Sequence, residues 1–280
     1  MADIMILGPD ASWSTHPEDI QEQLNVLRGL GLEFDVQVWT DPAPLDGYRL
    51  ILPLVTWGYH LIPDQWQAAL DRWEGLPFAN PLSVLRWNTD KAYLMDVQAK
   101  GVAVVPTRMT DALTPADLDA ACVAFGTESL VIKPPVSAGS EGTHLLRNGA
   151  AAPASALGQR MMIQPEMPAI SSEGEYSLFY FDGVFSHAIL KSCASGEFRV
   201  QPQFGGQSRT VEAEPAMRAL AEAALAAAPG AITYARVDMV RDGDAFRLME
   251  LELIEPFLFL HAAPDGGRAF VAAVQRASAG

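Results

Sequence analysis

The first 85 residues show two patterns of apolar positions. Residues 3–7 are predicted to form a strand, and the near-continuous apolar run 48–55 is typical of a strand buried on both faces of a parallel sheet. Residues 34–39 place apolar side chains at every second position, which predicts a further strand. Helices are predicted over 15–27 and from Pro63, where apolar residues recur every three or four positions. The pattern therefore predicts an open α/β sheet with ligands at the loops that follow its strands.

The middle of the chain combines helices with a short strand. Thr89 is expected to cap a helix that ends at Gly101, and a short strand is expected at 102–105. Thr114 and the proline after it are typical of the cap and first turn of a second helix, which ends at Gly126.

Strands dominate the pattern beyond residue 130. Two strands, 130–134 and 143–147, enclose a loop of small residues at 136–142, which predicts a hairpin. An alanine-rich helix is predicted at 215–228. Further strands are predicted at 161–164, 176–181, 184–191, 198–203, 235–241 and 246–252.

The charge balance restricts the classes of partner. The chain has 280 residues, of which 49% are hydrophobic, and its formal net charge is −15. Such a surface repels polyphosphate chains and anionic lipid headgroups, so neither nucleic acid nor a membrane is expected as a partner. A cationic side chain held in a cleft of this protein would need an anionic ligand to explain it.

Two cysteines, Cys122 and Cys193, lack the spacing of a zinc site or of a disulfide framework. They are interpreted as small buried residues in a reducing compartment. No apolar run approaches the ~20 residues of a membrane helix, and the N-terminus does not resemble a secretion signal. The sequence predicts a cytoplasmic protein.

Lys133 ends an apolar strand and is followed by two prolines and the small-residue loop. Such a lysine beside a loop of small residues is suited to phosphate, because backbone N–H groups can approach anion oxygens closely. The alternative is a β-hairpin with a solvated lysine, since the loop matches neither of the common glycine-rich phosphate motifs.

Three acids form a second candidate site. Glu250 and Glu252 lie two residues apart on a predicted strand, so both carboxylates share one face. Asp238 lies on the preceding strand. Three carboxylates on a partly apolar face would repel one another unless cations neutralise them, and Mg²⁺ takes such oxygen ligands together with substrate phosphates. The alternative is a solvated outer face of the sheet.

The segment 191–206 combines two cations, Lys191 and Arg199, with a Gly205-Gly206 turn. Taken alone, it is equally typical of two strands joined by a loop with surface charges.

In chain order, these segments resemble the ATP-grasp superfamily, and within it the glutathione synthetase and RimK-like ligases. The sequence at Lys91 resembles the family's first nucleotide lysine, 131–134 resembles the second, and 137–142 resembles the flexible glycine-rich loop. The segment 162–168 resembles the hinge whose backbone binds adenine, and Glu175 stands at the ribose acid. The resemblance assigns nucleotide binding to Lys91, Lys133, Ser137, Gly139, Ser140, Gly142, Gln164, Glu166, Met167 and Glu175.

The chemical segments of the family also have counterparts. Residues 196–199 with Gly205-Gly206 resemble the family segment that binds phosphate and the reacting carboxylate, and 236–238 and 249–252 resemble its metal strands. The resemblance implies ATP and Mg²⁺ (or Mn²⁺) as cofactors. The catalytic residues it implies are Arg199 and Lys191, and the metal ligands are Asp238, Glu250 and Glu252.

Some positions depart from the family pattern. Glu175-Tyr176 stands where relatives commonly carry Asp, or Asp and a basic residue. Glu252 stands where the third metal ligand is often Asn, and Glu255-Pro256 where small residues are usual. This Glu-Leu-Glu-Leu-x-Glu-Pro form resembles a subgroup of small ATP-grasp ligases that includes the cyclo-ligase of D-cycloserine biosynthesis.

The resemblance implies an α/β ATP-grasp fold in three parts. An N-terminal open parallel-sheet (pre-ATP-grasp) domain on the substrate side is expected over 1–85. A small central lid is expected over 86–165, and a C-terminal mixed α+β domain with the metal site over 166–280.

The implied activity is an ATP-dependent ligase that joins a small-molecule carboxylate to an amine. The amide forms through an acyl phosphate on an amino-acid-like substrate, with release of ADP and phosphate. Two alternatives stay open: an intramolecular cyclo-ligase of the D-cycloserine type, and a nucleotide-binding protein without catalysis. A homodimer also stays open. The residues expected to contact the substrate belong to no motif: Asp10, Ser12, Trp13, Trp57 and Tyr59.

Overall fold

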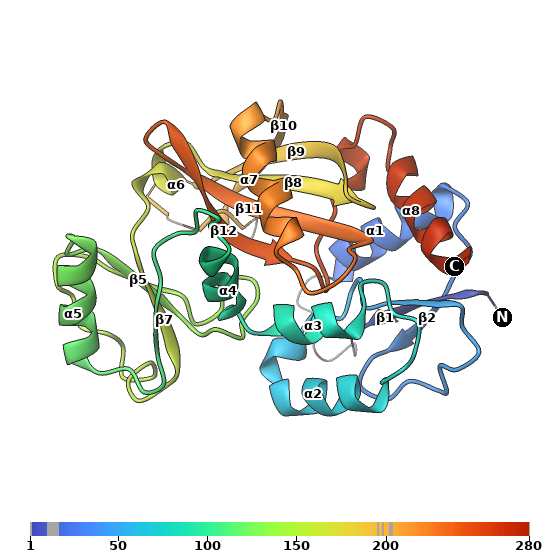
Figure 1. Ribbon diagram of the computed structural model, residues 1–280, viewed down its shortest axis with the longest axis horizontal. Coiled ribbons are helices and arrows are strands. Elements are labelled where there is room, and N and C mark those ends of the chain that lie inside the picture. The colour runs from blue at the N-terminus through green and yellow to red at the C-terminus, as the bar shows by residue number, and fades with distance from the viewer. Residues whose placement is uncertain (1, 10–16, 195, 198, 202–203, 280) are drawn as a thin grey trace.

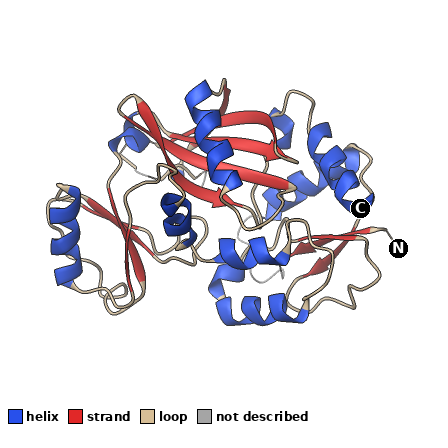
Figure 2. Cartoon of the chain, in the orientation of Figure 1, coloured by secondary structure: helices blue, strands red, loops and turns tan. Residues whose placement is uncertain are grey.

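The computed structural model describes residues 2–9, 17–194, 196–197, 199–201 and 204–279, which form three β-sheets with helices packed against them (Figures 1 and 2). Asp10, Ser12 and Trp13, three of the predicted substrate contacts, lie outside the described residues.

The first sheet is parallel and belongs to the N-terminal part. β1 (Ile4–Gly8) lies between β2 (Asp35–Val38) and β3 (Leu50–Leu52). Every residue of β1 is buried, because its even-numbered side chains face α1 (Pro17–Gly29) and its odd-numbered ones face α2 (Pro63–Arg72). The predicted open parallel sheet is confirmed.

The second sheet is antiparallel and carries the small-residue loop. Its order is β4 (Arg108–Thr110), β7 (Met161–Pro165), β5 (Leu130–Lys133) and β6 (His144–Leu146). The predicted hairpin is the β5–β6 pair. α5 (Pro115–Phe125) covers this sheet, with the predicted cap at its start and a left-handed glycine at its end.

The third sheet is antiparallel and forms the centre of the molecule. Leu178 and Leu190 on one face pack against α4 (Tyr93–Ala99) and α7 (Pro215–Ala226), and the other face contacts α8 (Arg268–Ala279). Its strands, in order, are β10 (Gln207–Val211), β9 (Val184–Ser192), β8 (Glu175–Phe181), β11 (Tyr234–Asp242) and β12 (Ala245–Glu252).

The remaining elements are short: η1 (Tyr59–Leu61), α3 (Leu82–Thr89), α6 (Pro168–Ser172) and η3 (Leu260–Ala262).

The prediction for Thr89 is wrong. Thr89 is the last residue of α3, where its hydroxyl donates to the carbonyl of Leu85 at 2.8 Å and accepts from the Trp66 indole at 3.0 Å. The carboxylate of Asp90 instead accepts from the backbone of Ala92 at 2.8 Å, before α4 begins. The hydroxyl is thus used inside the preceding helix and cannot cap the next one.

Other sequence-based expectations also need correction. The expected strand at 102–105 is reduced to a single bridge between Val104 and Leu248. The described residues of 198–203 form no strand, and β10 begins at Gln207. α8 was not predicted from the pattern, although it places Phe270, Val271 and Val274 in the core, and Cys122 and Cys193 are half-buried thiols rather than fully buried ones.

β12 is an edge strand, and side chains from α3 and α4 satisfy its outer backbone groups. The Asn88 amide accepts from the backbone of Leu253 at 2.9 Å and donates to the carbonyl of Leu251 at 2.8 Å. The Tyr93 hydroxyl accepts from the backbone of Leu251 at 2.6 Å. These contacts replace a missing neighbouring strand and orient β12 against the first half of the chain.

Each of the three predicted parts contains one sheet, although α4, assigned to the central part, packs on the third sheet. The boundaries 1–85, 86–165 and 166–280 stay a prediction. In the described part of the chain, no helix has the length and apolar character needed to cross a membrane.

We expect the free energy of unfolding to fall between about pH 6.5 and pH 4 because of His187. Its ring is buried, stacks on Phe179 with centroids 4.3 Å apart, and lies 3.1 Å from the carbonyl of Leu258. Burial lowers the pKa of His187 to about 4. The unfolded chain takes up a proton below about pH 6.5 and the folded one does not, so acid removes up to roughly 3 kcal/mol of stability.

Urea unfolding at about pH 7 and about pH 4.5 tests this expectation. His187→Gln should lose this part of the pH dependence, whereas His261→Gln, at an exposed histidine, should keep it. Equal pH dependence in the wild type and in His187→Gln would contradict the assignment.

Candidate active site

One face of the third sheet changes from apolar to ionic along its strands. On β8, Phe179 and Phe181 belong to the apolar core with α8, whereas Glu175 and Ser177 share their face two residues apart. The ionic end extends onto the neighbouring strands, where charged and polar residues lie directly opposite one another. These pairs are Glu175–Lys191, Ser177–Asp238, Asp238–Glu250 and Arg236–Glu252.

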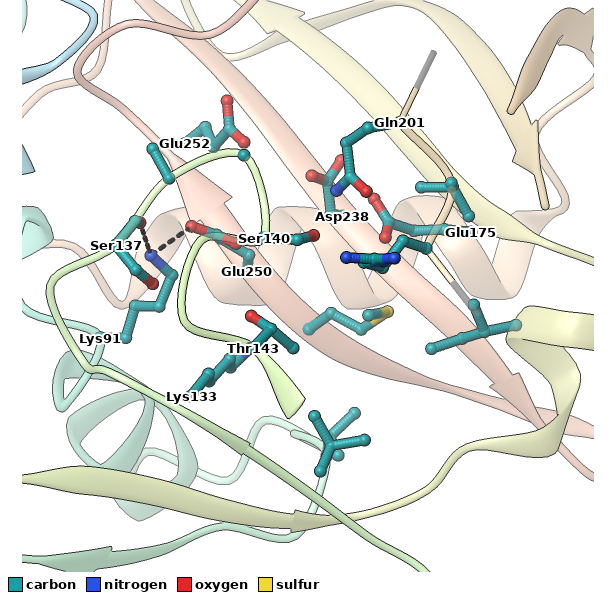
Figure 3. A pocket seen from close by; sticks show the side chains of 18 of the residues that line it. Lys91, Lys133, Ser137, Ser140, Thr143, Glu175, Gln201, Asp238, Glu250 and Glu252 are labelled. Atoms are coloured by element: carbon teal, nitrogen blue, oxygen red, sulfur yellow. Dashed lines mark hydrogen bonds and ion pairs between the residues drawn. The ribbon is translucent and has the colours of Figure 1, made fainter. Parts of the chain in front are cut away.

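A pocket lies over this ionic surface, between the third sheet, the second sheet and the loop 137–143 (Figure 3). The predicted site residues line it with two exceptions, Gly142 and Glu166. Those in the lining are Lys91, Lys133, Ser137, Gly139, Ser140, Gln164, Met167, Glu175, Lys191, Arg199, Asp238, Glu250 and Glu252.

Lys91 joins the loop to the acids. Its ammonium lies 3.0 Å from a carboxylate oxygen of Glu250 and donates to the carbonyl of Ser137, as Figure 3 shows. Its backbone N–H also donates to the carbonyl of Pro135 at 2.9 Å. This buried lysine therefore holds the start of the small-residue loop against β12.

Asp238 is the centre of a buried ion network. It accepts from the guanidinium of Arg236 at 2.8 Å and from the Ser177 hydroxyl, and lies 3.4 Å from the ammonium of Lys191. Burial alone would raise the pKa of Asp238, but the charges of Arg236 and Lys191 hold it well below its usual range. Asp238 is therefore ionised at neutral pH.

Each cation of this network also contacts a second acid. The Lys191 ammonium contacts Glu175, and the Arg236 guanidinium contacts Glu252. Burial would lower the pKa of Lys191, but the negative charges of Asp238 and Glu175 have the larger effect, so this pKa is raised. Burial raises the pKa of Glu252 to about 8 against the opposing charge of Arg236.

Lys133 has a different environment. Burial lowers the pKa of its ammonium, and the charge of Glu250 opposes this effect only in part. Among the described residues, no hydrogen bond or ion pair to this ammonium is formed. An anion bound in the pocket would stabilise its charged form, which agrees with the predicted phosphate contact.

Arg199 is held in a fixed orientation at the pocket. Its guanidinium lies 2.7 Å from Glu197 and stacks on the ring of Phe204 at 3.5 Å. The following turn depends on Gly206, where a Cβ atom would come within 2.0 Å of the carbonyl oxygen of Val200. Arg199 is thus paired with Glu197 and also lines the pocket.

Gly142 and Glu166 lie outside the lining. Gly142 has a φ of +67° and packs against Pro134, so it shapes the base of the loop. The carboxylate of Glu166 is paired with Arg147 at 2.6 Å. Nucleotide contacts by these two residues stay a prediction, and for the side chain of Glu166 the ion pair argues against one.

Several lining residues were not assigned to the site from the sequence. Arg236 could have been found, because it lies two residues before Asp238 on the same strand face. Tyr59, one of the predicted substrate contacts, does line the pocket, and Trp57 donates to the backbone carbonyl of Glu255 at 2.9 Å. The further unassigned polar side chains in the lining are Asn88, Thr143, Gln201 and Glu255.

The chemistry of the acids fits Mg²⁺ brought in with a nucleotide. In the described ranges, no three acidic, histidine or cysteine side chains form a ready-made metal site, since Glu250 is paired with Lys91, and Asp238 and Glu252 with Arg236. Mg²⁺ is usually held by one or two carboxylates plus phosphate oxygens rather than by an all-protein cage. Asp238, Glu250 and Glu252 supply such carboxylates in one pocket.

The chain is 30% identical over 294 aligned residues to the cycloserine biosynthesis protein DcsG of Streptomyces lavendulae, covering 97% of both chains. It belongs to the ATP-grasp ligases, in the family of DcsG. Residues 4–80 match the family described as D-cycloserine synthetase DcsG, N-terminal domain.

Solved structures agree with this assignment. The crystal structure of D-cycloserine synthetase DcsG has a TM-score of 0.85 and 28% identity, covering 98% of this chain and 99% of that one. D-alanine–D-alanine ligase of Bacillus anthracis, complexed with ATP, has a TM-score of 0.66 and 14% identity, covering 99% and 96%. The ligase PsnB, complexed with Mg and ADP, has a TM-score of 0.67 and 16% identity, covering 99% of both chains.

The predicted ATP-grasp fold and enzyme class are thus confirmed: this is an ATP-dependent ligase that forms a carbon–nitrogen bond. ATP and Mg²⁺ are confirmed as the cofactors of the family, in line with the complexes above. The N-terminal part, for which the sequence offered no motif, matches the DcsG N-terminal family over residues 4–80.

We expect Asp238→Asn to destabilise the protein far more than Glu250→Gln, although both changes are nearly isosteric. Asp238→Asn leaves the buried Arg236 and Lys191 without their shared counter-charge, at a cost of about 3–5 kcal/mol. Glu250 is 27% exposed, and Lys91 keeps its bond to Ser137 when Glu250 is neutral, so the loss there should be about 1 kcal/mol. Denaturant unfolding measures both values, and equal losses would contradict the network described here.

Proposed function

We propose that this ligase activates a substrate carboxylate as an acyl phosphate and then transfers the acyl group to an amine. The observation that supports the proposal is the lining of the pocket. In a protein of net charge −15, four cationic side chains that the resemblance assigns to ATP and catalysis line one pocket: Lys91, Lys133, Lys191 and Arg199. Such a concentration of positive charge suits a nucleotide triphosphate and the phosphoryl group that leaves it.

In the first step, a carboxylate oxygen attacks the γ-phosphorus of ATP, and the bond to the β-phosphate oxygen breaks to release ADP. In the second step, an amine nitrogen attacks the acyl carbon, loses a proton and displaces phosphate. Lys91 and Lys133 would neutralise the phosphates, and Lys191 would keep Asp238 and Glu175 in place. Arg199 would stabilise charge on the acyl phosphate and on the tetrahedral oxyanion.

Asp238, Glu250 and Glu252 would hold Mg²⁺, which supplies charge neutralisation on the phosphate oxygens when bound. The loop 137–142 would cover the phosphates, with Ser137, Gly139 and Ser140 as the lining contacts. Gln164 and Met167, from β7 and the residues after it, would lie at the adenine, and Glu175 at the ribose.

The substrate is proposed to be a small amino-acid-like carboxylate. A second candidate, in which amine and carboxylate belong to one molecule and a ring forms, is favoured by the similarity to DcsG over 97% of the chain. The full set of lysines, arginine and acids in the pocket argues against a protein without catalysis.

An ADP-release screen with Mg-ATP tests the function. Amino acids and their small derivatives, supplied singly and in pairs, should include at least one that releases ADP. Product mass separates the two candidates, because a cyclo-ligase consumes one molecule and its product lacks one water. No ADP release with any carboxylate would contradict the proposal.

Glu250→Gln should lower ADP release by at least ~100-fold, since a charge-bearing metal ligand is lost while the shape is kept. The measurement is turnover at rising Mg²⁺ concentration, with the folded fraction checked by circular dichroism. Unchanged turnover at saturating Mg²⁺ would show that Glu250 is no metal ligand.

Arg199→Met should lower turnover by roughly 10²–10³-fold, which corresponds to about 2.7–4 kcal/mol of transition-state stabilisation. Arg199→Lys should recover little of the lost turnover, because the point charge of lysine cannot reproduce the paired contacts of the planar guanidinium. ATP affinity should fall much less than turnover. If nucleotide binding and ADP release decrease in parallel, Arg199 binds phosphate and has no separate role in acyl transfer.

A further inference from the structure

The segment 134–143, which joins β5 to β6 and contains the small-residue loop, contacts the N-terminal part at two points. The side chain of Val136 packs against the apolar cluster around Trp66. Further along the segment, a carboxylate oxygen of Glu141 lies 3.0 Å from Nε2 of the His60 ring. The second sheet, which carries this segment, forms no strand pairs with the N-terminal sheet in the described part of the chain. The segment itself therefore connects the two parts.

Within this segment, Glu141 has a different position from the residues that line the pocket. Its backbone N–H donates to the carbonyl of Ala138 at 3.0 Å, and the N–H of Thr143 donates to the carbonyl of Ser140 at 3.1 Å. This compact turn places Ser137 and Ser140 in the lining, as Figure 3 shows, whereas Glu141 does not belong to it. The carboxylate of Glu141 is thus available for a contact that is separate from the proposed nucleotide contacts.

His60 is a fixed anchor for that contact. It lies in η1, which begins after Gly58 in the left-handed region at φ 96° and includes a hydrogen bond from the N–H of Leu61 to the carbonyl of Gly58 at 3.1 Å. The His60 ring meets the Tyr59 ring edge to face, with centroids 6.0 Å apart. The His60 side chain is 12% exposed and that of Glu141 is 61% exposed. The histidine is therefore packed into the N-terminal part, whereas the glutamate reaches it from the segment.

The His60 ring has one polar partner among the described residues. A carboxylate only accepts hydrogen bonds, so Nε2 carries the proton and donates to Glu141. Nδ1 is buried and has no hydrogen-bond partner in the described ranges. Burial lowers the pKa of His60, and Glu141 opposes this effect only in part, so the ring is neutral at pH 7. If the segment moved away, the ring would lose its one partner, which favours the position seen here.

We propose that the hydrogen bond between His60 and Glu141 is a latch that holds the segment 134–143 closed over the nucleotide by attaching it to the N-terminal part. Lys91 holds the start of the loop through the carbonyl of Ser137, and the latch holds it near its end. His60 and Glu141 are positioning residues, since they act through the loop and not on the reacting groups. The inference rests on the proposed function and adds its control: enclosure of the nucleotide depends on the part of the chain expected on the substrate side.

A double-mutant cycle tests the latch. His60→Phe keeps a planar ring and removes the donor, and Glu141→Ala removes the acceptor. The double variant completes the cycle, and Glu141→Gln keeps an acceptor oxygen. The matched control is Glu128→Ala, at an exposed glutamate that precedes β5 and lies outside the lining. Because Glu141 is exposed, its variants should keep the core intact even if His60→Phe disturbs the packing of η1.

Two measurements follow the closed state in the absence of any carboxylate or amine substrate. The first is the rate at which a fluorescent N-methylanthraniloyl derivative of ATP leaves the Mg²⁺-loaded protein when it is mixed with excess ATP. The second is backbone hydrogen exchange of the segment 134–143, with Mg²⁺ and a non-hydrolysable ATP analogue bound. A contact that only stabilises the fold would alter neither measurement in the folded protein.

His60→Phe and Glu141→Ala should each raise the nucleotide release rate by about 3–10-fold, as expected for one lost hydrogen bond to a charged group, with little change in the association rate. The double variant should release nucleotide no faster than either single variant, because both changes break the same contact. Glu141→Gln should change the rate by about twofold at most, since its amide oxygen still accepts from Nε2. Exchange should accelerate in 134–143 and stay unchanged in β5, and Glu128→Ala should match the wild type.

Three outcomes would overturn the latch. They are release rates in both single variants equal to that of the wild type, effects that multiply in the double variant, and faster release without faster exchange in 134–143. The screen for ADP release is a separate readout. If no carboxylate supports ADP release but the cycle behaves as expected, the proposed ligase reaction fails and the latch stands. ADP release together with multiplying effects in the cycle refutes only the latch.

Discussion

The structure depends on how the edge strand β12 satisfies its outer backbone hydrogen bonds. β12 ends the central sheet, and among the described residues only the bridge at Leu248 pairs its outer edge with other backbone. Asn88 and Tyr93 take that role with side-chain amide and hydroxyl groups, and Asn80 does so for the carbonyl of Leu253. Because an unpaired buried backbone group is costly, these contacts fix the strand in one position. The same strand carries Glu250 and Glu252, and Glu255 follows it, so the arrangement that closes the edge also positions the site.

The second constraint is charge. The protein is strongly acidic, yet its pocket holds lysines and arginines that pair with its acids across neighbouring strands. Asp238 between Arg236 and Lys191 shows why the network is stable: every buried charge has an opposite partner and direct hydrogen bonds. A nucleotide with Mg²⁺ would bring negative phosphates and a positive ion to this network. The phosphates would pair with its lysines and arginines, and Mg²⁺ with its carboxylates. Bound phosphate would stabilise the charge of two lysines most. They are Lys133, which has no partner among the described residues, and Lys91, which tethers the loop.

The pocket is lined by residues from different regions of the chain. The part that we propose for the nucleotide is lined by Lys133 of the second sheet, by small residues of its loop and by Lys91 from between α3 and α4. Tyr59 and Glu255 also line the pocket, and the indole of Trp57 bonds the segment after β12 to the N-terminal part. The match of residues 4–80 to the DcsG N-terminal domain lies in this N-terminal part. Residues of the sheets and of the interface between two regions of the chain thus meet in one pocket.

The sequence by itself determined the elements whose signal is local. Alternation on β8, β11 and β12 placed Asp238, Glu250 and Glu252 on a common face, and small residues beside Lys133 marked the loop, because a strand's period of two depends only on neighbouring residues. The tertiary structure alone decided which charges are paired. Arg236 meets Glu252, Lys91 meets Glu250, and Glu255 forms no ion pair with a described residue, although all three acids look alike in the sequence. The same holds for Thr89, whose hydroxyl bonds within α3 and to Trp66 of α2. Such outcomes depend on contacts between residues far apart in the chain, and these form only when the edge strand, the helices and the sheets are packed together.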